Sequence, residues 1–168
     1  MVTVTTPRPC ENTATVPATG LAHLVLLSAC VAETIKKILV VEDHDECRQL
    51  LAQLITRLGY EVFEAATGIE AIDQASTIHP DLIMLDLALP GMNGDETTAH
   101  LKANLSTRDI PVVINIPVVI ETPYIVEARA NRALDAGAAE ILYKPFDLTT
   151  LRNVLCRYVS TQDGTTSN

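Results

Sequence analysis

The feature that most constrains the fold of this chain is a regular alternation, beginning at Lys36, of short aliphatic runs with longer amphipathic stretches. The aliphatic runs have no polar alternation, which is typical of strands buried on both faces, and the stretches between them carry apolar residues at helical spacing. Strands that alternate with helices form a parallel sheet with helices on both faces. We therefore predict an α/β fold with a doubly wound, five-stranded parallel sheet. The expected strands are residues 38–41, 61–64, 82–85, a fourth within 110–121, and 141–143; the expected helices lie around residues 50–58 and at 69–78, 96–104, 125–136 and 148–159.

The length of 168 residues suits a single domain, which we place at residues 36–160. Residues 1–35 are rich in Thr and Pro at first and show no periodic apolar face, so we predict a disordered N-terminal extension, and residues 161–168 form a polar tail. The apolar run at 21–32 is far shorter than the roughly 20 residues that span a bilayer. It resembles the hydrophobic part of a signal peptide, but the basic segment that should precede it is missing, which favours an extension over export.

Composition excludes several classes of function. The formal net charge of −9 argues against a nucleic-acid surface, because phosphate backbones are bound chiefly by Lys and Arg. The four cysteines form no CxxC pair and have no His at zinc-binding spacing, so we expect a reducing, cytoplasmic setting without membrane association. No glycine-rich nucleotide loop and no GxSxG hydrolase motif is present in the sequence.

Polar residues stand where four of the five expected strands end. They are Glu42 and Asp43, Asp86, Thr122 and Lys144. Because ligands of open parallel sheets bind outside the carboxyl ends of the strands, we expect these side chains to converge. Converging carboxylates repel one another, and hard oxygen ligands are what Mg²⁺ prefers; a nearby ammonium and hydroxyl then suit a phosphoryl group. Each acid could instead merely cap the following helix, which is the better interpretation for Asp43 alone but a poor one for the whole set.

The stretches KKILVVEDHDECRQLL, DLIMLDLALPGMNG and GAAEILYKPFDLTTL, together with the Thr122 region, resemble the receiver domain of two-component response regulators, across roughly residues 36–160. The resemblance implies a flavodoxin-like strand order, 2-1-3-4-5. It also implies a cis peptide bond between Lys144 and Pro145. The roles that it implies are Asp86 as phospho-acceptor, Glu42 and Asp43 as the acidic pair that holds Mg²⁺, the backbone carbonyl of Ala88 as a further metal ligand, Thr122 as the hydroxyl that moves onto the phosphoryl group, and Lys144 as its cationic partner.

The function implied by this resemblance is that of a phospho-accepting switch. It takes a phosphoryl group from a histidine kinase or phosphotransfer protein onto Asp86, with Mg²⁺, and signals through changed partner binding or serves as a relay. We expect a stand-alone receiver, because no output domain follows Ser160, and no enzymatic activity beyond self-phosphorylation and self-dephosphorylation. The best rival enzyme class, the haloacid-dehalogenase phosphatases, needs a second Asp two positions after the first, where this chain has Ala88.

Two departures from the family pattern bear on switching. Ile141 stands where the family usually has an aromatic residue that moves with the threonine. A tandem repeat, IPVVIN at 110–115 and IPVVIE at 116–121, lengthens the segment before Thr122 by one copy. We predict that the second copy forms the fourth strand, because Thr122 must follow that strand and because one strand through both copies would have Pro117 in its middle. The alternative function is a degenerate receiver that acts as a non-switching interaction module.

Overall fold

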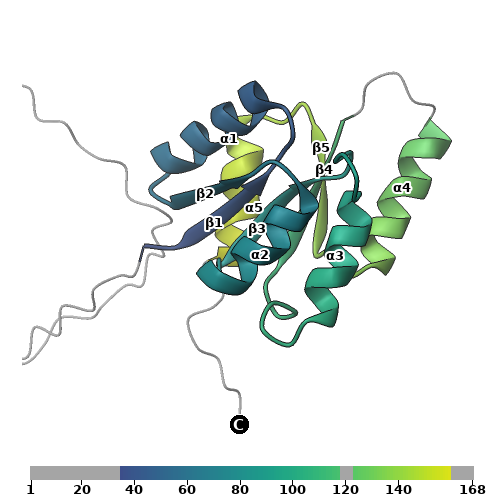
Figure 1. Cartoon of the computed structure of the whole chain (residues 1–168). Coiled ribbons are helices and arrows are strands. Elements are labelled where there is room, and N and C mark those ends of the chain that lie inside the picture. The colour runs from purple at the N-terminus through teal and green to yellow at the C-terminus, as the bar shows by residue number, and fades with distance from the viewer. Residues whose placement is uncertain (1–34, 118–122, 160–168) are drawn as a thin grey trace, which may run out of the picture.

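The structure, a computed structural model, describes residues 35–117 and 123–159 and contains one five-stranded sheet (Figure 1). All neighbouring strands pair in parallel, in the order β2-β1-β3-β4-β5, so the predicted fold class and strand order are confirmed. The extension at 1–35, except Ile35, and the tail at 161–168 lie outside the described residues. The strands are β1 (Lys37–Val41), β2 (Glu61–Ala65), β3 (Leu82–Asp86), β4 (Val112–Pro117) and β5 (Glu140–Lys144).

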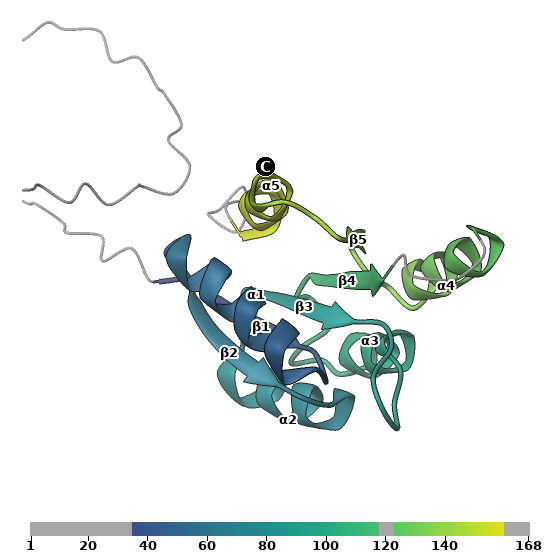
Figure 2. The same cartoon turned by 90° about the horizontal axis from the view of Figure 1, so that it is seen from above.

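Five helices cover the two faces of the sheet (Figure 1; Figure 2). Apolar side chains of α1 and α5 pack in one core cluster, and those of α2, α3 and α4 pack in another on the opposite face. This division follows from right-handed crossovers that change direction at β1, the first strand in the chain. The helices are α1 (Asp45–Arg57), α2 (Gly68–Ile78), α3 (Gly94–Ala103), α4 (Pro123–Asp135) and α5 (Leu148–Val159).

The central strands β1 and β3 explain why their sequences are almost wholly aliphatic. Successive side chains of a strand point to opposite faces, and here both faces are covered, so that Leu39 packs in one cluster and Val40 in the other. All five residues of β3 are buried, including Asp86 at its end. Fully burying an aliphatic side chain contributes roughly 1.5–3 kcal/mol, so the burial of these two strands contributes strongly to stability.

The fourth strand corrects the prediction from sequence. β4 is formed by the first copy of the repeat together with Ile116 and Pro117, rather than by the second copy. Pro117 is the last residue of the strand, where a missing N–H does least harm to the ladder. Because the repeat has an even number of residues, either copy could place its aliphatic side chains on the same faces.

Two interactions explain why the first copy is used. The Lys102 ammonium donates to the backbone carbonyls of Arg108 and Ile110, at 2.9 and 2.7 Å, and so holds the entry to β4 in place. The copies also differ at their last position, where the strand has Asn115 and the second copy would bring Glu121. That position is 1% exposed, and burying an unpaired carboxylate is far more costly than burying an amide.

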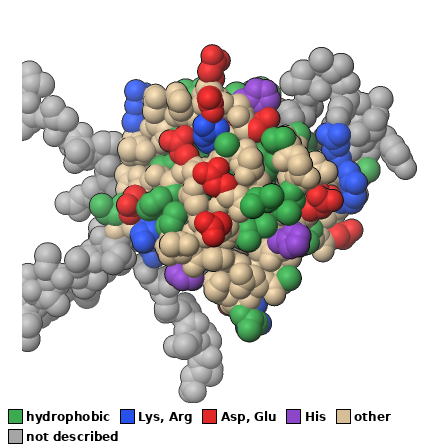
Figure 3. Space-filling view, in the orientation of Figure 1, with side chains coloured by type: hydrophobic (Ala, Val, Ile, Leu, Met, Phe, Trp, Pro, Cys, Tyr) green, Lys and Arg blue, Asp and Glu red, His purple; other side chains and the backbone are tan. Residues whose placement is uncertain are grey.

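The surface reflects the acidic composition of the chain. On the face seen in Figure 3, acidic side chains spread across the centre and Lys and Arg side chains lie mainly toward the edges. This face therefore has no basic stripe of the kind that binds nucleic acid. Within residues 35–117 and 123–159, no helix combines the length and the apolarity needed to cross a membrane.

Candidate functional site

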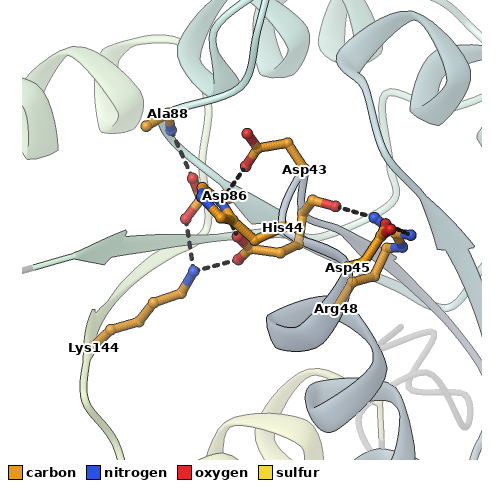
Figure 4. Close-up of polar contacts among 8 residues, drawn as sticks. Asp43, His44, Asp45, Arg48, Asp86, Ala88 and Lys144 are labelled. Atoms are coloured by element: carbon orange, nitrogen blue, oxygen red, sulfur yellow. Dashed lines mark hydrogen bonds and ion pairs between the residues drawn. The ribbon is translucent and has the colours of Figure 1, made fainter.

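The carboxyl ends of β1, β3 and β5 bring together most of the residues singled out in the sequence. Glu42 and Asp43 follow β1, Asp86 ends β3, and Lys144 ends β5. Figure 4 shows the side chains of Asp43, Asp86 and Lys144 directed toward a common centre. The predicted convergence of these four residues is therefore present in the structure.

Asp86 is held through both of its carboxylate oxygens. Oδ1 accepts a hydrogen bond from the Lys144 ammonium at 2.7 Å, and Oδ2 accepts one from the backbone N–H of Ala88 at 2.9 Å. The residue is 4% exposed. Its carboxylate is thus fixed in one orientation at the end of a buried strand, and the backbone of Ala88, predicted to contribute a metal ligand, lies at the same site.

Lys144 bridges two buried carboxylates. Its ammonium donates to Asp86 (Figure 4) and also to Glu42, and both acids are almost fully buried. Burial alone acts to lower the pKa of Lys144, but the hydrogen bonds to Asp86 and Glu42 outweigh it, and the pKa is raised. The lysine is therefore charged at neutral pH. The peptide bond from Lys144 to Pro145 is cis, as predicted.

Asp43 is more open than the other two acids, with 29% of its side chain exposed. Its Oδ1 lies 3.0 Å from Nδ1 of His44, and this hydrogen bond, with the charge of Asp43, raises the pKa of His44. The three acids carry three negative charges when ionised, and Lys144 supplies one positive charge beside them. An excess of negative charge remains at the site.

The structure adds two supporting residues that the sequence analysis missed. Nη1 of Arg48, on α1, donates to the backbone carbonyl of Glu42 at 2.8 Å and so fixes the loop that carries both acids. Gly94, the first residue of α3, packs against the end of β3: a Cβ at this position would lie 2.5 Å from the backbone oxygen of Asp86. The PGMNG stretch after β3 was a signal for this close approach, and no local pattern pointed to Arg48.

The predicted hydroxyl is not among the residues brought together. Thr122 lies outside the described residues. The position of β4 in register with Asp86 is occupied by Asn115, whose side-chain oxygen is buried and has no hydrogen-bond partner in the part of the chain that the structure describes. Ile141, at the position where an aromatic residue is usual, packs against the core cluster on the α2, α3 and α4 face.

The donor set fits a hard divalent cation. Glu42, Asp43 and Asp86 offer carboxylate oxygens, and two of the three are buried where an uncompensated charge is costly. Oxygen ligands with room for water are what Mg²⁺ takes in proteins. The residues present therefore suit the metal that the family pattern implies.

Comparison with known proteins agrees with this geometry. Residues 38–156 match the response regulator receiver domain family. This chain belongs to that family. The chain is 33% identical over 124 residues to sporulation initiation phosphotransferase F of Bacillus subtilis, and the alignment covers 74% of this chain and 94% of that protein. It is 41% identical over 78 residues to the polar-differentiation response regulator DivK of Brucella ovis, and this alignment covers 46% of this chain and 63% of that protein.

Solved receiver structures share the fold. The receiver domain of a sensor histidine kinase from Pseudomonas aeruginosa was crystallised with a magnesium ion coordinated in its active site cleft. It superposes with a TM-score of 0.67 at 27% identity, and the match covers 76% of this chain and 100% of that chain. A chemotaxis protein of Vibrio cholerae superposes with a TM-score of 0.65 at 28% identity, and the match covers 74% of this chain and 99% of that chain.

Proposed function

We propose that this receiver accepts a phosphoryl group on Asp86 in the presence of Mg²⁺ and signals through changed binding to a partner. The observation that carries the proposal is the position of Asp86, which is buried at a strand end and held by Lys144 and the Ala88 N–H. An acid with only a structural role would need hydrogen-bond partners but no further acids around it. An acid beside two further carboxylates and a shared lysine has the charge arrangement of a phosphoryl-transfer site, with a cation placed to neutralise the transferred oxygens.

In the transfer, a carboxylate oxygen of Asp86 attacks the phosphorus of a phosphohistidine, a phosphorus–oxygen bond forms, and the phosphorus–nitrogen bond to the donor imidazole breaks. The Lys144 ammonium, 2.7 Å from Oδ1, is placed to neutralise charge on the transferred oxygens. Bound Mg²⁺, which Glu42, Asp43, Asp86 and the backbone carbonyl of Ala88 would hold, would supply further charge neutralisation. The protein acts as acceptor and, in this proposal, turns over no separate substrate.

The donor that fits this chemistry is a histidine kinase or a phosphotransfer protein. The family membership and the name of the Bacillus relative, a phosphotransferase, support a place in such a relay. The phosphoryl group on Asp86 adds negative charge at the end of β3, and this group competes with Glu42 for the Lys144 ammonium. Redistribution of that lysine between two acids is a difference in contacts through which phosphorylation can shift a conformational equilibrium.

Binding of beryllofluoride, a stable phosphoryl analogue, tests this proposal directly. Fluorine NMR of the full chain with Mg²⁺ should show bound beryllofluoride in the wild type and none in Asp86→Asn. Asp73→Asn is the matched control, because Asp73 is an exposed acid on α2 away from the site. Absence of bound analogue in the wild type, or binding that survives Asp86→Asn, contradicts the proposal.

A second candidate, the non-switching interaction module, is favoured by one observation. The last residues of β4, Ile116 and Pro117, have no hydroxyl that could contact a phosphoryl group. Under this candidate beryllofluoride still binds at Asp86, but amide chemical shifts change only around the site. A functional switch instead predicts shift changes that extend to β5 and α5.

A further inference from the structure

His44 lies in the loop after β1 that carries Glu42 and Asp43, and the proposed function assigns its side chain no role. It is the N-cap residue of α1, but its side chain makes no capping hydrogen bond to the helix. The imidazole faces the acids instead: Nδ1 lies 3.0 Å from Oδ1 of Asp43 and 3.6 Å from Oε1 of Glu42. Its side chain is also 75% exposed, against 29% for Asp43, so the imidazole is accessible to ions in solvent.

We propose that His44 is a ligand of the bound metal, through Nδ1, and that it gives this receiver a preference for a divalent transition metal ion over Mg²⁺. The inference rests on the proposed function, because it concerns the identity of the metal at the same site. The ligand atoms of Glu42, Asp43 and His44 all lie within 4.8 Å of one another, so that small side-chain movements would bring all three to one ion.

The spacing of these atoms suits coordination. Two ligand atoms in neighbouring positions of an octahedral ion, each about 2.1 Å from the metal, are about 3 Å apart. The distances from Nδ1 to the carboxylate oxygens, 3.0 and 3.6 Å, are close to this value. Replacing the hydrogen bond between His44 and Asp43 by a shared ion therefore needs little movement of either side chain.

The nitrogen donor changes which metal is favoured. Mg²⁺ takes oxygen ligands and gains little from an imidazole, whereas Co²⁺, Ni²⁺ and Zn²⁺ bind imidazole well. A site of carboxylates alone discriminates weakly among such ions. Adding His44 to Glu42 and Asp43 should therefore raise the affinity for transition metals and leave the affinity for Mg²⁺ almost unchanged.

Calorimetric titration of the full chain with Co²⁺ and with Mg²⁺ tests the inference. His44→Ala should weaken Co²⁺ binding about tenfold or more, with Mg²⁺ binding changed by less than about twofold. His100→Ala, an exposed histidine on α3, and Cys47→Ser, an exposed thiol on α1, are the matched controls and should leave both affinities unchanged. The inference is overturned if His44→Ala loses no Co²⁺ affinity, or loses Co²⁺ and Mg²⁺ affinity equally. It is also overturned if Cys47→Ser loses as much Co²⁺ affinity as His44→Ala.

A second measurement identifies the ligand atom. With diamagnetic Zn²⁺, nitrogen NMR of the His44 ring should show the large shift at Nδ1, and a large shift at Nε2 or at neither nitrogen contradicts the proposed geometry. Failure here is distinguishable from failure of the proposed function. A receiver that binds beryllofluoride at Asp86 with Mg²⁺ but has no His44-dependent metal preference refutes this inference alone.

Discussion

Nζ of Lys144 lies 2.7 Å from Oδ1 of Asp86, although the strands that end in these residues do not pair with each other. β4 separates β3 from β5, and Asp86 is in register with Asn115, whereas Lys144 is in register with Pro117. The long lysine side chain therefore reaches back across β4 to the acid. This reach gives one ammonium access to both Asp86 and Glu42, and it makes the site depend on how β4 is placed.

Lys144→Met should lower the free energy of unfolding by about 2–4 kcal/mol, because it leaves two buried carboxylates without their cation. Denaturant unfolding measures the loss. Lys36→Met is the matched control: Lys36 pairs with Asp81 at 3.4 Å with both side chains about a quarter exposed, and its loss should cost under about 1 kcal/mol. Equal costs for the two variants would contradict the bridging role of Lys144.

The same pair predicts a direction of pH dependence. The pKa of Lys144 is raised above its ordinary value of 10.5, so the stability from its ion pairs is fully present below that pH. It is lost as the pH rises through the higher folded-state value. The stability difference between wild type and Lys144→Met should therefore stay constant from neutral pH to about pH 10 and shrink only above it.

Gly94→Ala should destabilise the protein by about 2–3 kcal/mol, because the added Cβ would lie 2.5 Å from the backbone oxygen of Asp86 and 2.9 Å from Cα of Leu87. Phosphoryl addition should fall as well, since the end of β3 must move. Gly91→Ala separates this contact from backbone strain: its φ is +78° and its Cβ would meet nothing within 4 Å, so we expect a loss of about 1 kcal/mol and normal phosphorylation. Similar behaviour of the two variants would argue against close packing at Gly94.

Asn115→Leu should raise the free energy of unfolding by about 1 kcal/mol, because it removes a buried amide oxygen that has no partner among the described residues. Glu121→Leu, the same position of the other copy, should change stability little. The two variants together show which copy of the repeat forms β4, since a strand formed by the second copy would reverse their effects on stability. A large gain for Glu121→Leu with none for Asn115→Leu would contradict the observed strand.

Asp43→Asn should remove the response of stability to Mg²⁺. A ligand that binds only the folded state, present at about ten times its dissociation constant, adds about 1.4 kcal/mol. The wild type should gain this stabilisation and lose it on chelation, whereas the variant lacks a metal-binding carboxylate. An equal response in both proteins would place the metal elsewhere.

Much of the fold follows from the sequence because strand and helix identity depend on local periodicity. The run at Leu82–Asp86 has no polar residue before its last position, and only a strand covered on both faces accommodates it. The strand order and the four converging residues came from the family resemblance and from the rule that ligands bind at strand ends. Glu42, Asp43, Asp86 and Lys144 lie where these arguments placed them.

The misassigned strand has a different origin. The two repeat copies share five of six residues, so local pattern cannot separate them, and the choice of the second copy relied on Thr122. What separates them is tertiary: the contact of Lys102 with the start of the first copy, and the burial of the position in register with Asp86. Arg48 was missed for a similar reason, because its bond to the backbone of Glu42 depends on the turn between β1 and α1.

Intact-mass analysis after incubation of the full chain with acetyl phosphate and Mg²⁺ determines whether Asp86 accepts a phosphoryl group. We expect one added phosphoryl group in the wild type and in the exposed-acid control Asp73→Asn, none in Asp86→Asn, and little in Asp43→Ala or after the metal is chelated. A wild type that stays unmodified with acetyl phosphate and with phosphorylated histidine donors, or a phosphoryl group that persists in Asp86→Asn, would contradict it.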